Sequence, residues 1–279
     1  MIKKIFVLAF GLFIAMTSFG QVSSDSLQNA NDSVVTEDSY SEFPVVALGS
    51  GLTKAAGDSA YMRNDYASAI QLYETLLKDG EAAEVYYNLG NSYYKSENIA
   101  RAILNYERAL LLQPSNADIR ANLEIARAKT IDKVIPVAEI FFISWTKSLI
   151  NCLNVDAWGY VGIVCFFLLL ISLYFFFFSK QIVWKKAGFI TGIVFLIVVI
   201  LTNVFAFQQK HEILNRNNAI VLTPSVTVRS TPSDSGTSLF ILHEGRKVEI
   251  KDATMREWRE IRLEDGKVGW VAASSVEVI

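Results

Sequence analysis

Residues that carry metal, redox and nucleophilic chemistry are scarce in this sequence. Its 279 residues include two histidines and two cysteines, and the formal net charge is -2. Cys152 and Cys165 lack the paired spacing of a zinc site, and neither belongs to a disulfide framework of the kind that small secreted domains use. We interpret both as apolar residues and expect no metal or other cofactor. Because the chain has no clustered basic face, nucleic acid is not an expected partner.

Motifs of the common enzyme classes are also missing. The chain contains no HExxH, no glycine-rich phosphate loop and no G-x-S-x-G. A Cys or Ser nucleophile normally needs a nearby base, most often His. His211 follows a long apolar run, and we expect His243 to be solvated in a turn. The sequence therefore predicts no catalytic residues; an envelope enzyme that uses Cys152 or His243 is the alternative.

Charged residues are absent from two long segments. Trp158 to Phe178 and Ala187 to Phe207 are each 21 residues without Asp, Glu, Lys or Arg. As helices they are about 31 Å long, which matches the roughly 30 Å hydrocarbon core of a bilayer. The alternative is a pair of buried core helices, but these usually carry a polar stripe and are shorter. We predict two transmembrane helices, at 158–178 and 187–207.

The connector between the two runs predicts the topology. Residues 179–186 contain Lys180, Lys185 and Lys186, and short loops rich in lysine stay on the cytoplasmic side. The segments on both sides of the hairpin are then expected to be periplasmic, at the inner membrane of a bacterium.

The N-terminus agrees with this orientation. Residues 1–20 combine Lys3 and Lys4 with an apolar run and small residues before Gln21, which is typical of a signal peptide. We expect cleavage after Gly20, with an uncleaved anchor as the alternative. Residues 21–48 are rich in Ser, Asp and Asn and are expected to form a flexible leader.

Residues 49–132 resemble themselves at a period of 33 to 34 residues. The clearest copy, Ala83 to Asn116, resembles a tetratricopeptide repeat, in which small residues let two antiparallel helices approach closely. A weaker copy precedes it, and the segment after Pro114 is expected to close the stack. The residues that define the repeat are Tyr86, Leu89, Gly90, Tyr93, Ala102, Tyr106, Ala109 and Pro114.

The resemblance implies a binding groove lined by the first helix of each repeat. In the best copy the groove residues are Glu84, Tyr87, Asn91 and Tyr94; packing against a neighbouring helix is the alternative for both tyrosines. Repeats of this kind usually bind proteins, which is an argument from resemblance.

One known use of such a groove, a clamp for a C-terminal carboxylate, is not predicted. Lys54 has a clamp-like position, but Asp58 stands where an Asn is needed. Ala121 and Ile125 replace the required basic residues.

An amphipathic segment precedes the first apolar run. Residues 137–155 place Phe141, Phe142 and Trp145 on one side and polar residues on the other. The segment either lies in the outer membrane interface or packs on the repeat block or the spans.

The C-terminal residues 219–279 change to short β-rich runs separated by turn residues. About five strands in 60 residues suit a small barrel, and VRSTP, LHEG and DGKVGWV resemble a bacterial SH3-like domain. Trp258 and Trp270 are candidate groove residues, with a place in the barrel core as the alternative.

The fold class that follows is a multidomain membrane protein. It combines an α-helical tetratricopeptide repeat block, a two-helix transmembrane hairpin and a small all-β SH3-like barrel. This arrangement, more than any single motif, resembles the BatE proteins of the Bacteroides aerotolerance operon. The resemblance implies envelope membrane proteins as partners, including von Willebrand A-type proteins of the same operon, and a role in aerotolerance or envelope stress tolerance.

Two functions are compatible with these features. The first is a non-enzymatic scaffold in the lipid bilayer whose periplasmic domains bind protein partners. The alternative is a cell-wall sensor whose SH3-like domain binds peptidoglycan.

Overall fold

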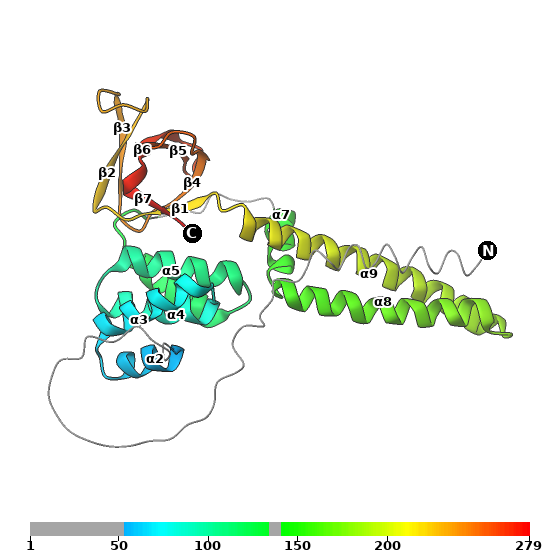
Figure 1. The fold of residues 1–279 in the computed structure, drawn as a ribbon. Helices are drawn as coiled ribbons and strands as arrows, with labels where there is room; N and C mark the ends of the chain where they lie inside the picture. The colour runs from blue at the N-terminus through cyan, green and yellow to red at the C-terminus, as the bar shows by residue number, and fades with distance from the viewer. Residues whose placement is uncertain (1–52, 134–140) are drawn as a thin grey trace, which may run out of the picture. The chain divides into compact units, whose positions relative to one another are not determined.

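The computed structural model describes residues 53–133 and 141–279 (Figure 1). The predicted signal peptide and leader, and the first residues of the predicted repeat block and amphipathic segment, lie outside these ranges. The repeat block consists of five helices: α2 (Lys54–Met62), α3 (Tyr66–Asp79), α4 (Ala83–Lys95), α5 (Ile99–Leu112) and α6 (Ala117–Ala128).

The turns between paired helices repeat with the period of the sequence. Asn64 and Glu97 have φ values of 62° and 61°, and each is followed by an N-cap residue. The side chain of Asp65 accepts a hydrogen bond from the Ser68 N–H, and that of Asn98 accepts one from the Arg101 N–H, both at 3.2 Å. These caps satisfy backbone donors that the first turn of a helix leaves free.

Glycine lets the two helices of each pair approach. A Cβ atom on Gly57 would lie 2.5 Å from the ring of Tyr73, and one on Gly90 would lie 2.7 Å from the ring of Tyr106. Both tyrosines are about 1% exposed. The aromatic ring therefore fills the space that each glycine leaves.

Three helices follow: α7 (Phe141–Ile150), α8 (Val155–Phe178) and α9 (Ile182–Leu214). They differ from the predicted bounds in two ways. The amphipathic segment is not one helix to Val155, because α7 ends at Ile150 and Asn154 caps α8 through a 3.0 Å bond from the Ala157 N–H. The connector is also shorter than 179–186, since α9 begins at Ile182 and includes Lys185 and Lys186.

Small and hydroxyl residues line the contact between α8 and α9. A Cβ atom on Gly188 would lie 2.7 Å from the backbone oxygen of Ser172. The Ser172 and Thr191 hydroxyls lie 3.0 Å apart. Gly188 and Gly192 form a GxxxG pair, which permits close helix packing in a bilayer.

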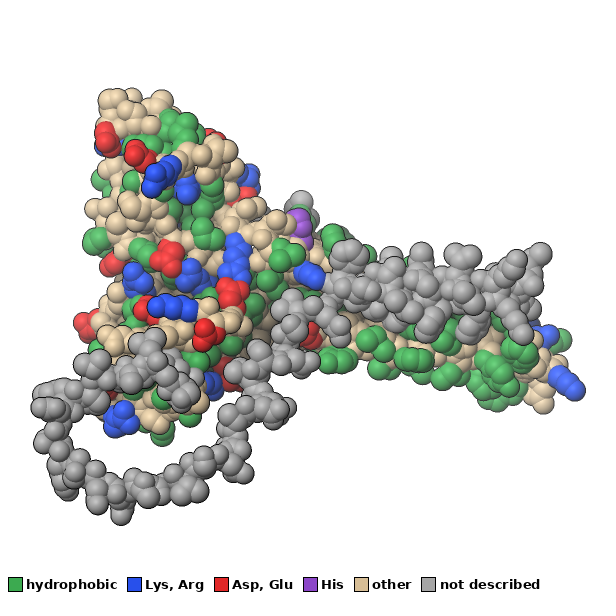
Figure 2. Space-filling model, in the orientation of Figure 1, with side chains coloured by type: hydrophobic (Ala, Val, Ile, Leu, Met, Phe, Trp, Pro, Cys, Tyr) green, Lys and Arg blue, Asp and Glu red, His purple; other side chains and the backbone are tan. Residues whose placement is uncertain are grey.

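Both helices are long and apolar enough to cross a membrane. Only 17% and 11% of the residues in their most apolar windows are buried, and Figure 2 shows hydrophobic side chains along their surface. This exposure differs from the core helix of a soluble protein, which is mostly buried.

The C-terminal domain is one antiparallel sheet with the strand order β3-β2-β6-β5-β4-β1-β7. It has seven strands rather than the expected five. Val228, Val248, Ile261 and Val271, all at most 2% exposed, lie in its core. The strands are β1 (Asn218–Val221), β2 (Ser225–Arg229), β3 (Ser238–His243), β4 (Lys247–Asp252), β5 (Trp258–Arg262), β6 (Val268–Ala272) and β7 (Val276–Val278), with a short helix η1 (Ala273–Ser275) before β7.

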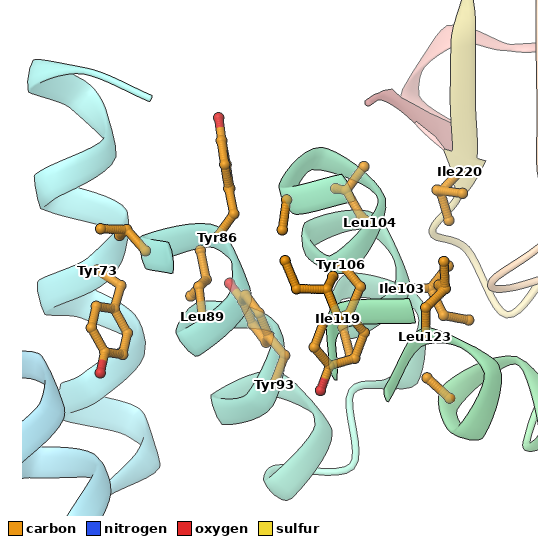
Figure 3. Close-up of a cluster of buried hydrophobic side chains, with 14 of the residues drawn as sticks. Tyr73, Tyr86, Leu89, Tyr93, Ile103, Leu104, Tyr106, Ile119, Leu123 and Ile220 are labelled. Carbon is orange, nitrogen blue, oxygen red and sulfur yellow. The ribbon is translucent and has the colours of Figure 1, made fainter. Parts of the chain in front are cut away.

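The barrel shares a hydrophobic cluster with the repeat block. Ile220 of β1 and Ile279 belong to the cluster built by α2 to α6, and Figure 3 shows Ile220 beside Ile103 and Leu123. Gly245, at φ +82°, lies so close to Thr130 that a Cβ atom would be 2.6 Å from its methyl carbon. The helix α6 closes the stack as expected, and the barrel packs on the stack as well.

Candidate functional site

A network of amides and tyrosines links the groove-facing residues of α4 and α6. The Asn122 amide donates to the Tyr87 hydroxyl at 2.9 Å and to Asn91 Oδ1 at 3.0 Å. Asn91 Oδ1 also accepts the hydroxyl of the buried Tyr106 at 2.8 Å. The ring centroids of Tyr87 and Tyr106 lie 6.0 Å apart. These bonds fix the side chains on two successive repeats before any ligand is present.

A second network joins α2 to α4. Asp58 Oδ1 accepts the Tyr73 hydroxyl at 2.6 Å and the Asn88 amide at 2.9 Å. Lys54 Nζ lies 3.0 Å from Glu84 and 3.7 Å from Asp58. The hydrogen bond to Glu84 raises the pKa of Lys54, and burial raises that of Tyr73.

The part of this surface on α6 is more apolar. Ile125 is 53% exposed, Ala121 is exposed beside it, and Lys129 Nζ lies 4.2 Å from the ring centroid of Tyr94. The predicted groove surface thus combines paired charges on α2 and α4 with aromatic and aliphatic side chains toward α6.

The four predicted groove residues fall into three separate contacts. Tyr87 and Asn91 meet through Asn122, Glu84 pairs with Lys54, and Tyr94 lies under Lys129. Asn88, Asn122 and Lys129 were not among the predicted residues. Asn88 and Asn122 are separated by one repeat period, which could have identified them as equivalent positions on successive repeats. Lys54, which is already paired with Glu84 and Asp58, is not free to clamp a carboxylate.

The predicted tryptophans lie on the face of the sheet away from the barrel core. Trp258 pairs with Ala272 and Glu260 pairs with Trp270, so both indoles share one face, with Ile261 and Val271 on the other. Residues in this diagonal relation are about 7–8 Å apart. Both tryptophans are half-buried and neither belongs to the buried cluster, so the core alternative is not supported.

A buried carboxylate lies where the barrel meets the repeat block. Glu107 of α5 is 7% exposed; its carboxylate contacts Arg127 of α6 and accepts a 2.8 Å bond from Lys247 of β4. Burial by itself raises the pKa of Glu107, but the charges of Lys247 and Arg127 outweigh it and lower the pKa below its ordinary value. Removing Arg127 or Lys247 would leave the buried carboxylate of Glu107 without full compensation.

Further polar contacts join the barrel to the repeat block. His243 Nδ1 lies 2.8 Å from Asp132, and the His243 N–H donates to the same carboxylate at 2.7 Å. Arg108 donates to Glu277 at 2.9 Å and to the Val278 carbonyl at 2.5 Å. The expectation that His243 is freely solvated is therefore wrong, because it holds the barrel to the end of the repeat block.

The remaining candidates for chemistry are dispersed. Cys152 and Cys165 are free thiols, and His211 contacts Asn215 on α9. In residues 53–133 and 141–279, no group of three or more His, Cys, Asp or Glu side chains could hold a metal ion.

Comparison with protein families agrees with this geometry in two places. Residues 83–116 match the tetratricopeptide repeat family, with the bounds predicted for the best copy. Residues 224–277 match the bacterial SH3 domain family. No curated protein matches the chain. The chain therefore carries a tetratricopeptide repeat and a bacterial SH3 domain, which suggest protein–protein interaction and peptidoglycan as a further class of partner.

Proposed function

We propose that this protein is a non-enzymatic membrane scaffold whose repeat groove and SH3-like barrel hold envelope proteins at the outer face of a bacterial inner membrane. The observation that carries the proposal is the bridge from Asn122 to Tyr87 and Asn91. Side chains that are ordered before binding lose less conformational entropy when a ligand binds.

Contacts between the domains support the membrane arrangement. The helices α8 and α9 separate the repeat block from the barrel in sequence, yet Ile220 and Ile279 pack into the repeat cluster. Two domains with a shared core occupy one side of a membrane, and a hairpin returns the chain to the side from which it came. Lys180, Lys185 and Lys186 favour a cytoplasmic turn.

The biological role in this proposal comes from the resemblance to the BatE proteins. In this role the protein binds von Willebrand A-type membrane proteins and supports aerotolerance or envelope stress tolerance. The arrangement of the domains, rather than any one side chain, supports it.

Site-specific photocrosslinking in intact cells tests the groove. A photoreactive residue at position 125 of the full-length protein, where Ile125 is 53% exposed, is expected to capture a partner. Asn122→Ala is expected to reduce capture because it releases Tyr87 and Asn91. Gln71→Ala, an exposed change on α3, is the matched control. Equal capture by both variants, with normal folding by circular dichroism, would contradict the proposal.

Peptidoglycan binding by the barrel is the second candidate, favoured by the outward position of Trp258 and Trp270. Full-length protein in detergent should co-sediment with purified peptidoglycan, and Trp270→Ala should reduce the bound fraction more than Trp184→Ala, a change in α9. The intact chain is required because an isolated barrel would expose Ile220 and Ile279. Absence of co-sedimentation would remove this candidate.

A further inference from the structure

The helix α7 carries an aromatic surface that no other described part of the protein covers. Phe141 and Phe142 are each 73% exposed and Trp145 is 56% exposed. At about 100° of rotation per residue, these three side chains and Leu149 share an arc of about 100°. Thr146, which lies next to this arc, donates its hydroxyl to the Phe142 carbonyl at 2.7 Å.

The remainder of α7 divides into a polar face and a packing face. Ser144 and Lys147 lie on the side away from the aromatic arc, about 160° and 140° around the helix from Phe142. Ser148 borders the arc beside Phe141, and Ile150, which is 4% exposed, faces its neighbours. A short helix with an aromatic face and a polar face is the pattern of helices that lie in a membrane interface.

Side chains of α8 and α9 hold the end of α7. The Gln209 amide donates to the carbonyls of Ile150 and Leu153 at 2.7 and 2.8 Å, and the Trp158 indole donates to Ile150 at 2.9 Å. Gln209 is 4% exposed. These bonds satisfy carbonyls that the end of a helix leaves free.

This attachment fixes the level of α7 relative to the apolar surface. Gln209 comes two residues after the uncharged run of α9 ends at Phe207, and Trp158 begins the run of α8. The end of α7 is thus held where the apolar surface of the hairpin gives way to polar residues. Tyr160, which is 70% exposed on α8, continues the aromatic surface at this level, as in an aromatic belt.

We propose that α7 lies in the outer membrane interface, with Phe141, Phe142 and Trp145 inserted at the boundary between lipid headgroups and acyl chains, and that Gln209 holds it there. The proposal rests on the proposed membrane hairpin. Lipid is the occupant that fits, because Trp158 and Gln209 hold the end of α7 at the level where the apolar surface of α8 and α9 ends. Ser144 and Lys147 lie on the other side of α7 from the aromatic arc.

Spin labels at three depths test the proposal in full-length protein reconstituted into phosphatidylglycerol and phosphatidylethanolamine vesicles. With Cys152→Ser and Cys165→Ala as background, single labels are introduced by Phe142→Cys, Ser144→Cys and Phe167→Cys. The label at position 142 is expected about 5–10 Å below the headgroup boundary, with oxygen collisions favoured over those with a water-soluble nickel complex. The label at 144, on the opposite side of α7, should collide more with the nickel complex than with oxygen, and the label at 167 should lie deepest.

The three labels separate failure of this inference from failure of the proposed function. If the label at 142 collides with nickel as often as the label at 144 while that at 167 stays in lipid, the hairpin stands and the interfacial helix is wrong. Shielding of position 142 from both reagents would mean that a protein surface covers it, which also overturns the inference. A nickel-accessible label at 167 would overturn the membrane hairpin itself.

The role of Gln209 has a separate test in the same system. Gln209→Ala should increase the mobility of the label at 142 and move it toward water, because the α7 carbonyls lose their donor. Gln208→Ala, an exposed neighbour, should leave the spectrum unchanged. Identical spectra for the two variants would show that Gln209 does not position α7.

Discussion

The repeat block and the α8–α9 hairpin both use glycine to bring antiparallel helices together, but they fill the freed space differently. In the repeat block, Gly57 and Gly90 each face a buried tyrosine ring. In the hairpin, Gly188 faces the backbone of α8 at Ser172, so that two main chains come into direct contact. One region buries aromatic area, and the other shortens the distance between helices.

The surroundings of the two regions explain this difference. In water, burial of a tyrosine ring removes a large apolar area from solvent and stabilises the fold. Helices among lipid tails gain little from that source, so close packing and interhelical hydrogen bonds contribute more. The choice of partner for each glycine is therefore the one expected if only the hairpin lies in a membrane.

Charge distinguishes the two regions further. The repeat block joins the barrel through the buried group of Glu107, Arg127 and Lys247. The side-chain bond between α8 and α9 at Ser172 and Thr191 involves neutral hydroxyls. We expect the first contact to respond strongly to substitution and to pH, and the second to respond weakly.

Glu107→Ala should have the largest effect on the repeat block. It removes the bonds of Glu107 to Arg127 and Lys247, and a hydrogen bond to a charged group contributes about 1.5–3 kcal/mol. The measurement is urea unfolding of the full-length protein in detergent. Glu124→Ala is the control, since Glu124 contacts the same Arg127 at 2.9 Å but its side chain is 64% exposed; exposed pairs contribute about 0–1 kcal/mol. Equal losses would show that burial of Glu107 is not decisive.

Acid pH should weaken the same contact. The pKa of Glu107 is lower in the folded protein than the ordinary value, so its contribution is complete above the ordinary glutamate pKa of about 4.3. It is lost as pH falls through the lower folded value. The difference in unfolding free energy between the native chain and Glu107→Gln should therefore shrink between neutral and acid pH. A difference independent of pH would contradict this assignment.

Gly90→Ala tests whether the Tyr106 ring fills the space that Gly90 leaves between α4 and α5. The added Cβ would lie 2.7 Å from the Tyr106 ring, and overpacking of this kind costs about 1–3 kcal/mol. Gly80→Ala is the control, because no atom lies within 4 Å of a Cβ at that position. Thermal unfolding compares the two, and a Gly90→Ala protein as stable as the control would show that Tyr106 can move aside.

Tyr106→Phe should have a smaller effect. It keeps the ring and removes the 2.8 Å bond to Asn91, which typically contributes about 1 kcal/mol. Asn91 retains the bond from Asn122, so capture at position 125 should fall less than in Asn122→Ala. A larger loss of capture than in Asn122→Ala would place the centre of the network at Tyr106.

Ser172→Ala should have the smallest effect. It removes one hydroxyl from the α8–α9 contact, and hydrogen bonds between helices in bilayers contribute about 0.6 kcal/mol on average. Unfolding in bilayer-like detergent, with Ser179→Ala at the connector as control, measures it. A loss as large as that of Glu107→Ala would contradict the contrast between the two regions.

Periodicity and hydropathy were sufficient to predict the main elements. Gly57, Ala69 and Tyr73 recur one period later as Gly90, Ala102 and Tyr106. This recurrence indicated which helix faces pack together. Uncharged runs indicated α8 and α9, because such long apolar segments have few stable surroundings. The alternation of Val226, Val228, Val248 and Ile250 indicated strands but not their number, since the ends of short strands depend on their neighbours.

The groove was predicted only in part. Glu84, Tyr87, Asn91 and Tyr94 followed from the repeat, but Asn122 lies on another helix and meets Tyr87 only after the stack has formed. The separation of Asn88 and Asn122 by one period indicates that they occupy equivalent faces of their helices. It does not indicate which side chain forms a hydrogen bond with Asn122.

The sequence by itself determined which segments form repeat helices, apolar helices and strands, because these patterns are local. Only the tertiary structure decided that Lys247 reaches Glu107, that His243 holds Asp132, and that Ile220 and Ile279 complete the repeat cluster. It likewise decided that Gln209 holds the end of α7. Each of these pairs joins residues at least 50 positions apart, and no local periodicity records which distant side chain satisfies a buried charge or a free carbonyl.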